Sequence, residues 1–159
     1  MSDSGNALIS VIQHISQINA PEQVVSLISR QLKSYGASGS DEAILGALEN
    51  ALREGSRAVL FCRYAQPGDP VAFAFGNVCS GLESGGDYLW LNELYVDDAW
   101  RRRGVAGELL DYIESWARTS RIGYIALTTG TTNSAALELY RKKGYDLDSG
   151  PWIDKALLQ

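Results

Sequence analysis

Cysteine and histidine are scarce in this chain. Its 159 residues include two cysteines and one histidine, and Cys62 and Cys79 do not form a CxxC pair. Metal centres built from these residue types need several of them at short spacings, so the sequence predicts no metal site. We expect both cysteines to be free thiols in strands. His14 lies far from the motifs described below, and we expect it to be solvated or hydrogen-bonded.

Long apolar runs are also missing. No stretch approaches the ~18 consecutive apolar residues of a membrane-spanning helix. Residues 1–5 do not lead from a basic start into an apolar run, as a secretory signal does. From these absences we expect a soluble, cytoplasmic protein with no membrane partner.

Basic residues are fewer than acidic ones. The chain has 14 Lys and Arg against 19 Asp and Glu, for a formal net charge of -5. Polyanions bind to broad basic surfaces, so nucleic acid is not expected as a partner. An acidic surface attracts cationic amines weakly over long range, but it does not identify a substrate.

The overall composition fits one domain. The chain is 45% hydrophobic and 21% charged, and its length is sufficient to bury a sizeable core. The sequence contains no internal repeat, low-complexity tract or interdomain linker. We therefore expect residues 1–159 to form a single domain.

Hydrophobic periodicity predicts a mixed sheet. Strands are expected at residues 8–15, 57–64, 70–78, 87–96, 122–128 and 151–157, the first in competition with a short helix. Helices are expected at residues 20–34, 41–52, 104–120 and 133–143, with Asp41 as the cap of the second. Turn-rich loops at 66–69 and 81–86 favour antiparallel hairpins, whereas a helix between two strands favours a parallel pair. The fold class is therefore α/β or α+β.

The most informative segment is the turn that follows the strand ending at Val96. Gly104 and Ala106 make the start of the next helix small, so a ligand can approach its backbone closely. The first N–H groups of a helix have no partner within it, and the helix dipole favours a phosphate there. Arginines at 101–103 would add charge-assisted contacts to a diphosphate. An ordinary connection with solvated arginines is the alternative.

Two segments together resemble the GCN5-related N-acetyltransferase (GNAT) family. The spacing of Val96, Arg101, Gly104 and Ala106 resembles the acetyl-CoA-binding motif of that family, and residues 133–145 are similar to its later helix. The resemblance is strong over residues 89–145 and topological before them. It implies a mostly antiparallel central sheet with one parallel pair, flanked by about four helices. Dimers are common in the family, so a homodimer is compatible with the resemblance.

The resemblance also implies where acetyl-CoA, the cosubstrate, binds. Main-chain groups near Leu94 and Val96 would hold the pantetheine arm, and Tyr95 between them is expected to pack in the sheet. Asn133 would cap its helix, bond the pantetheine, or do both. The pyrophosphate would be wrapped by Arg101, Arg102, Arg103, Gly104, Val105, Ala106 and Gly107.

Tyr140 is the candidate acid. Asn133 and Tyr140 are seven residues apart, so two helical turns return them to the same face. The resemblance implies that Tyr140 faces the thioester and protonates the departing thiolate, for which a phenol of reference pKa ~10 is suited. A tyrosine packed in the core is the alternative.

The identity of the general base is open between two neighbouring residues. The resemblance implies an acidic residue one or two positions before the Leu-Tyr-Val segment. Asn92 and Glu93 occupy those positions, and strand alternation sends them to opposite faces. If Trp90, Asn92 and Leu94 share the catalytic face, Glu93 points away and Asn92 can only orient a water. If a bulge shifts the register, Glu93 faces the substrate.

The function implied is acetyl transfer from acetyl-CoA to a primary amine by direct attack in a ternary complex. A small molecule such as a polyamine or amino acid is the first expectation for the acceptor. A lysine of a peptide or protein is the second. A CoA-binding sensor domain without catalysis is a further alternative, although the presence of Tyr140 argues against it.

Overall fold

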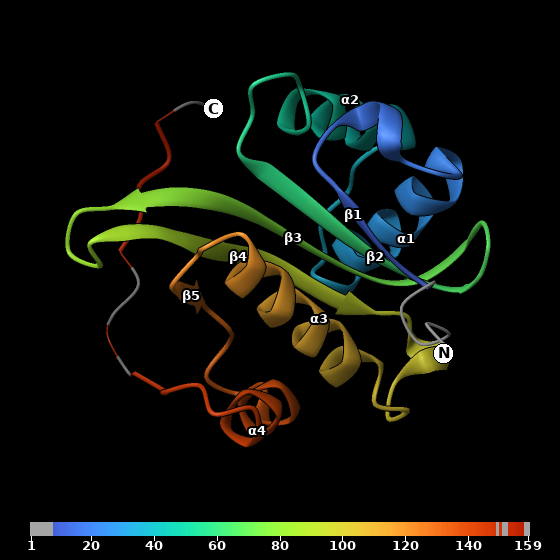
Figure 1. Cartoon of the computed structure of the whole chain (residues 1–159). Helices are drawn as coiled ribbons and strands as arrows, with labels where there is room; N and C mark the ends of the chain where they lie inside the picture. Colours follow the sequence, from blue (N-terminus) through green and yellow to red (C-terminus); the bar gives the residue numbers. More distant parts are fainter. Residues whose placement is uncertain (1–7, 149, 151–152, 158–159) are drawn as a thin grey trace, which may run out of the picture. The chain divides into compact units, whose positions relative to one another are not determined.

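The computed structural model describes residues 8–148, 150 and 153–157 (Figure 1). A five-stranded sheet has the strand order β1-β2-β3-β4-β5. Its strands are β1 (Ile9–Ile12), β2 (Ala58–Gln66), β3 (Asp69–Gly81), β4 (Gly86–Val96) and β5 (Tyr124–Leu127). The helices of the described residues are α1 (Pro21–Ser34), α2 (Asp41–Ala51), α3 (Val105–Thr119) and α4 (Ser134–Lys142), with the 3₁₀ turns η1 (Ile15–Gln17) and η2 (Asp98–Trp100).

The chain divides into two compact units. Met1–Thr128 contains the whole sheet with α1, α2 and α3, and Thr129–Gln159 contains α4. Within the first unit, β1 to β4 pair antiparallel in sequence order, and β4 pairs parallel with β5. A parallel pair needs a long crossover, which α3 provides. The predicted mixed sheet with one parallel pair is confirmed.

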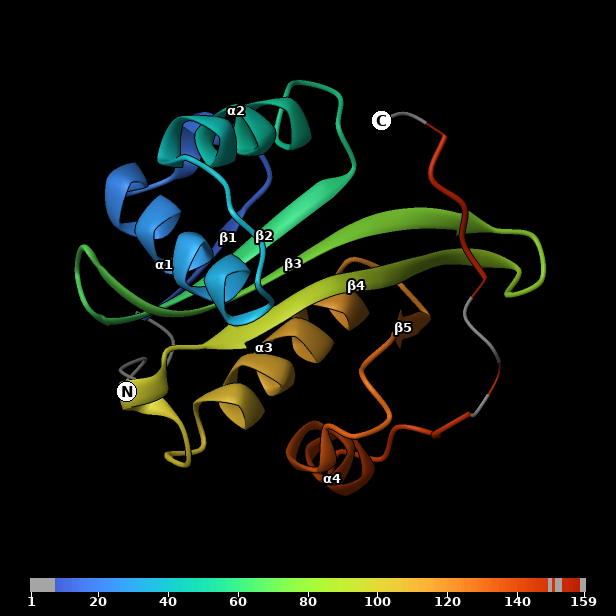
Figure 2. The same cartoon turned by 180° about the vertical axis from the view of Figure 1, so that it is seen from behind.

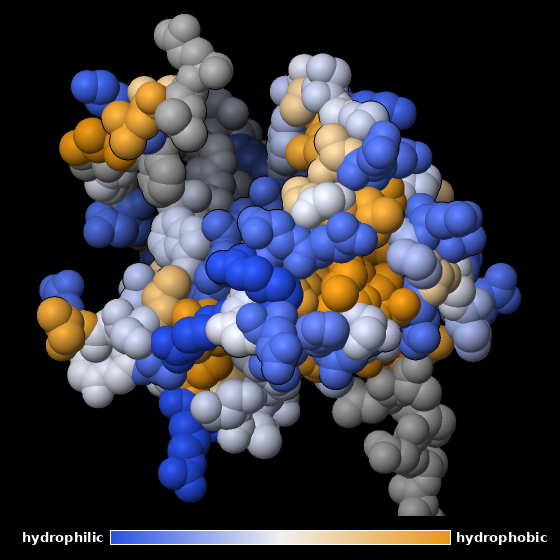
Figure 3. Space-filling model, turned by 90° about the horizontal axis from the view of Figure 1, so that it is seen from above, coloured by the Kyte–Doolittle hydropathy of each residue, from blue (hydrophilic) through white to orange (hydrophobic). Residues whose placement is uncertain are grey.

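Helices cover both faces of the sheet. Figures 1 and 2 show α1 and α2 on one face and α3 on the other. Neighbouring residues of β2 pack against the helices on both faces, because successive side chains of a strand point to opposite faces of the sheet. Leu60 belongs to the core beneath α1 and α2, whereas the Phe61 ring contacts the Trp116 ring of α3 edge-on, with centroids 5.1 Å apart. Outside the cores, hydrophobic patches alternate with hydrophilic residues on the face drawn in Figure 3.

The helix ends follow local rules, with one correction. Pro21 stands at the start of α1, where its missing N–H is harmless. We expected Asp41 to cap α2, but the hydroxyl of Ser40 accepts the bond from the backbone N–H of Ala43, at 3.1 Å. Asp41 lies instead in the first turn, where its negative charge interacts favourably with the positive end of the helix dipole.

The ends of the chain differ from the expectation. The first strand is shorter than predicted, and η1 meets the range 8–15 only at Ile15, so the strand and not the competing short helix is realised there. The prediction of a strand at 151–157 is wrong for 153–157, which form no strand; residues 151 and 152, including Trp152, lie outside the described residues. Asp154 and Lys155 are poor strand formers, which agrees with this result.

Candidate functional site

Strand β4 contains a bulge at Asn92. Phe75 of β3 pairs with Glu93, and Gly76 pairs with Leu91, so Asn92 is the extra residue between them. A bulge breaks the alternation of a strand and re-aims the side chains beside it. Of the two registers that the sequence left open, the structure therefore has the bulged one.

The bulge places two polar side chains on one face of the sheet. Asn77 of β3 donates from Nδ2 to Oδ1 of Asn92 at 2.9 Å, and Gln31 of α1 donates from Nε2 to Oε2 of Glu93 at 2.7 Å. Tyr95, two residues farther along, belongs to the core beneath α1 and α2. Asn92 and Glu93 thus both project on the α1 face, where regular alternation would have separated them.

Beyond the bulge, β4 has an open edge on its β5 side, where no other strand of the described residues pairs with it. Its pairing with β5 covers Tyr88 to Leu91, although β4 continues to Val96. The backbone N–H of Asp97 donates to the Val71 carbonyl of β3 at 2.9 Å. Because alternate residues direct their backbone groups to opposite sides, those of Val96 and Leu94 point away from β3. A ligand with amide groups can bond such an edge as an added strand does.

The turn before α3 leaves the helix start without a cap. Arg102 and Gly104 both have left-handed backbones, with φ of 58° and 79°. The first helical bond runs from the Glu108 N–H to the Gly104 carbonyl at 3.0 Å, and Gly104 makes no side-chain cap bond. The N–H groups of residues 105–107 therefore lack a helical acceptor. Such a helix start, with the dipole behind it, suits an anion.

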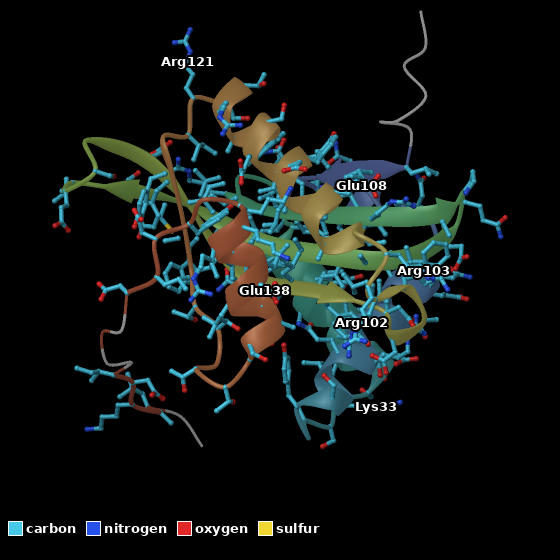
Figure 4. All side chains as sticks on the ribbon, turned by 90° about the horizontal axis from the view of Figure 1, so that it is seen from below. Lys33, Arg102, Arg103, Glu108, Arg121 and Glu138 are labelled. Carbon is cyan, nitrogen blue, oxygen red and sulfur yellow. The ribbon has the colours of Figure 1, made fainter. Side chains whose placement is uncertain are left out.

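The three arginines of this turn have different environments. Arg101 forms an ion pair with Asp98 at 2.9 Å, donates to the Val96 carbonyl at 3.1 Å and lies 5.6 Å from the Tyr95 ring centroid. It therefore braces the turn. Arg103 stacks on the Trp100 ring at 5.1 Å. Arg102 is exposed, and Figure 4 shows it with Arg103 at this turn.

Tyr95 packs in the sheet, as expected. Its side chain is 8% exposed, and its ring lies 6.0 Å from that of Phe73. Burial raises its pKa above the usual value, and the nearby carboxylates of Asp98 and Asp97 raise it further. The phenol therefore stays protonated at neutral pH.

An ion pair connects α1 to the start of the turn. Arg30 contacts Asp97 at 2.8 Å, and the Asp97 carboxylate also caps η2 by accepting from the Ala99 N–H at 3.2 Å. The helix that carries Gln31 is thereby joined to both ends of the segment from Glu93 to Asp97.

The second unit holds the other two predicted residues. Asn133 caps α4, since its Oδ1 accepts from the Ala136 N–H at 3.2 Å. Tyr140 is 6% exposed, and its ring meets that of Tyr145 edge-on with centroids 5.6 Å apart. Gly144, with φ of 82°, ends the helix. The capping role predicted for Asn133 is confirmed.

Sequence reasoning did not identify Gln31 or Asn77. One signal for Gln31 was available: it continues the apolar stripe of Val24, Leu27 and Ile28 at helical spacing. A polar side chain on such a stripe needs a partner. Asn77 offered no comparable signal, because β3 is long and its pairing was unknown.

A hollow of about 440 Å³ lies elsewhere in the first unit, between β1 and α3. It is lined by Ile9, Glu108, Asp111, Tyr112, Ser115, Trp116 and Thr119. None of the predicted site residues lines it, so the bulge and the turn are separate from it. Among the described residues, no three His, Cys, Asp or Glu side chains gather as a metal site would require, and no helix is long and apolar enough to cross a membrane.

Sequence similarity to a curated protein covers part of this chain. The chain is 32% identical over 65 residues to the uncharacterized N-acetyltransferase YhdJ of Bacillus subtilis (strain 168), a match that covers 40% of this chain and 46% of that protein. The chain thus spans about half the length of the curated relative that it matches.

Three solved structures share the fold. The crystal structure of a probable acetyltransferase has a TM-score of 0.80 at 21% identity, covering 95% of this chain and 97% of that one. The crystal structure of an aminoglycoside acetyltransferase, meta-AAC0020 from an uncultured soil metagenomic sample, in complex with sisomicin, has a TM-score of 0.76 at 15% identity. That match covers 95% of each chain. The ribosomal-protein-alanine N-acetyltransferase of Brucella melitensis biovar Abortus 2308 has a TM-score of 0.74 at 16% identity, covering 93% of this chain and 99% of that one.

The family itself follows from a broader match. The model of the Acetyltransferase (GNAT) family matches residues 22–145, from the start of α1 to the aromatic residue after α4. This range contains the bulge, the turn and the later helix. The chain belongs to the GNAT family of acetyltransferases.

Proposed function

We propose that this protein transfers the acetyl group of acetyl-CoA to a primary amine of a small molecule, such as a polyamine or an amino acid. The observation that carries the proposal is the open edge of β4 leading to the uncapped start of α3. One strand edge and one helix start thus offer backbone groups to the two chemically different parts of CoA.

The residues present fit CoA. The outward backbone groups of Leu94 and the outward N–H of Val96 would bond the amides of the pantetheine arm, since the Val96 carbonyl already accepts from Arg101. The N–H groups of residues 105–107, with Arg102 and Arg103, would hold the pyrophosphate. Arg101 would act indirectly, because its guanidinium already binds Asp98 and the Val96 carbonyl.

The acceptor amine must lose a proton before it can attack. When bound, acetyl-CoA supplies a thioester whose carbonyl carbon accepts the amine nitrogen, so that a C–N bond forms and the C–S bond breaks. We assign Glu93 as the base that removes the ammonium proton, directly or through a water held by Asn92. The role of Tyr140, donation of a proton to the departing sulfur, rests on its place in the resembling motif. The sum is an acetylated amine, free CoA and one released proton.

The domain and the compartment belong to the same proposal. The family match runs from residue 22 to 145 and so crosses both compact units. This supports one catalytic domain over residues 1–159. On the composition described above, we propose the cytoplasm as its location.

The test is CoA release from acetyl-CoA across polyamines, amino acids, aminoglycosides and lysine peptides, with acetyl-CoA binding measured by calorimetry. Cys79 is a partly exposed free thiol, so the assay should use Cys79→Ser protein to remove background in thiol detection. Turnover with a small amine supports the proposal, and turnover with lysine peptides alone would replace the acceptor class. Binding without any turnover would favour a CoA sensor, and folded protein that does not bind acetyl-CoA would refute the assignment.

A further inference from the structure

A buried amide of α1 contacts the proposed base. Gln31 is 1% exposed, and its Nε2 donates to Oε2 of Glu93 at 2.7 Å. These residues are 62 positions apart in sequence. The contact therefore exists only because α1 packs across β4.

Packing alone does not explain an amide at this position. The other residues of the stripe, Val24, Leu27 and Ile28, are apolar, and methionine would fill a similar volume. Burying an amide is unfavourable unless its polar atoms are bonded. Ser29, the other buried polar residue of α1, makes no such bond to β4 among the described contacts. The distinctive property of Gln31 is its bond to the Glu93 carboxylate.

We propose that Gln31 is a positioning residue for Glu93 in the acetyl-transfer reaction; this inference rests on the proposed function. By donating to Oε2, Gln31 holds the carboxylate in one orientation and leaves Oε1 to accept the proton of the acceptor amine. Glu93 projects toward α1 on the face that Tyr95 shares two residues later, and the bulge brings Asn92 to that face as well. Arg30, one residue before Gln31, pairs with Asp97 and anchors the same helix to the end of β4.

The experiment is a double-mutant cycle with the best acceptor from the amine panel. Gln31→Met keeps the length and removes the donor. It should lower kcat by roughly 10- to 100-fold, the loss expected when a reacting group is misplaced, while KM for acetyl-CoA changes less than about twofold. In a Glu93→Gln background, where no carboxylate remains to orient, Gln31→Met should change kcat by less than about twofold.

Ser29→Ala is the matched control for α1 packing, and it should leave kcat nearly unchanged. Gln31→Asn is the second variant: its amide is one methylene shorter, so it should lower kcat in the same way if Gln31→Met does not fold.

Equal losses in both backgrounds would mean that Gln31 only supports the fold, and the inference would be wrong. A normal kcat for Gln31→Met with a poor one for Glu93→Gln would also overturn it, leaving the proposed function standing. A normal kcat for Glu93→Gln would show that Glu93 is not the base, and the inference would fall with it. Absence of turnover with every amine would instead contradict the proposed function.

Discussion

At the scale of single residues, the site depends on which atoms are already engaged. Arg101 belongs to the family-like motif, yet its guanidinium binds Asp98 and the Val96 carbonyl. Arg102 and Arg103 stand beside the uncapped helix start. A motif thus identifies the turn, whereas contacts distinguish the residue that braces it from those placed for a phosphate.

Tyr140→Phe tests the acid at this scale. Only a proton donated in the transition state would be lost, so kcat should fall about 100-fold or more, and the Kd for acetyl-CoA should stay within about twofold. Tyr145→Phe is the control, because it keeps the ring that packs on Tyr140 and should retain kcat within about threefold. Steady-state kinetics and calorimetry measure the two quantities. An unchanged kcat for Tyr140→Phe would exclude the acid role.

At the scale of elements, one extra residue in β4 changes which side chains share a face. Glycine opposite the bulge permits this packing: a Cβ at Gly76 would lie 2.8 Å from the Trp90 carbonyl oxygen and 2.9 Å from Leu89 Cδ1. The Trp90 carbonyl belongs to the backbone of β4, so relieving this contact would require the strand itself to shift. Gly76 is therefore required by the close approach of β3 and β4.

Gly76→Ala should lower the free energy of unfolding by about 1–3 kcal/mol, as overpacking does. Gly46→Ala in α2 is the control, because a Cβ there meets nothing within 4 Å; it should raise stability by about 0.5–1 kcal/mol. Urea unfolding of both variants gives the comparison. Equal stability for the two would show that the strands are not in close contact at Gly76.

The turn before α3 gives a second prediction at this scale. Gly104→Ala introduces only the strain of a left-handed backbone, since φ is 79° and a Cβ meets nothing within 4 Å. Gly104→Glu adds a negative charge at the proposed pyrophosphate site. The Kd for acetyl-CoA should therefore rise at least about tenfold more for Glu than for Ala, by charge repulsion. Calorimetry measures both, and similar values would place the pyrophosphate elsewhere.

At the scale of the whole molecule, the core beneath α1 and α2 contains a thiol. Cys62 is fully buried in β2, and burial raises its pKa to about 12. In the unfolded chain a cysteine ionises near pH ~8.5. Between these two values the unfolded state binds fewer protons than the folded state, so stability falls as pH rises.

The free energy of unfolding should accordingly decrease above pH ~8.5, by up to about 1.4 kcal/mol per pH unit from this group. Cys62→Ala removes the thiol, so its unfolding free energy should depend less on pH. Urea unfolding at pH 8 and pH 10 measures the difference for each protein. Parallel decreases in the two proteins would contradict the assignment to Cys62.

Much of the fold could be predicted because its signals are local. Pro21, Gly144 and the spacing of apolar residues place α1, α4 and α3 close to their observed bounds. Hairpin loops at 66–69 and 81–86 pair the middle strands as expected. The segment 153–157 was mispredicted because its pattern of residues says nothing about whether a partner strand exists.

The sequence by itself determined the order of elements, the small-residue turn at Gly104 and the family-like spacing, since each depends on residues a few positions apart. Only the tertiary structure decided that β4 bulges at Asn92 and that Gln31 bonds Glu93. Strand register and a contact across 62 residues follow from how α1, β3 and β4 pack together. The free energy that selects them is spread over the whole core, so no short segment of the chain encodes it.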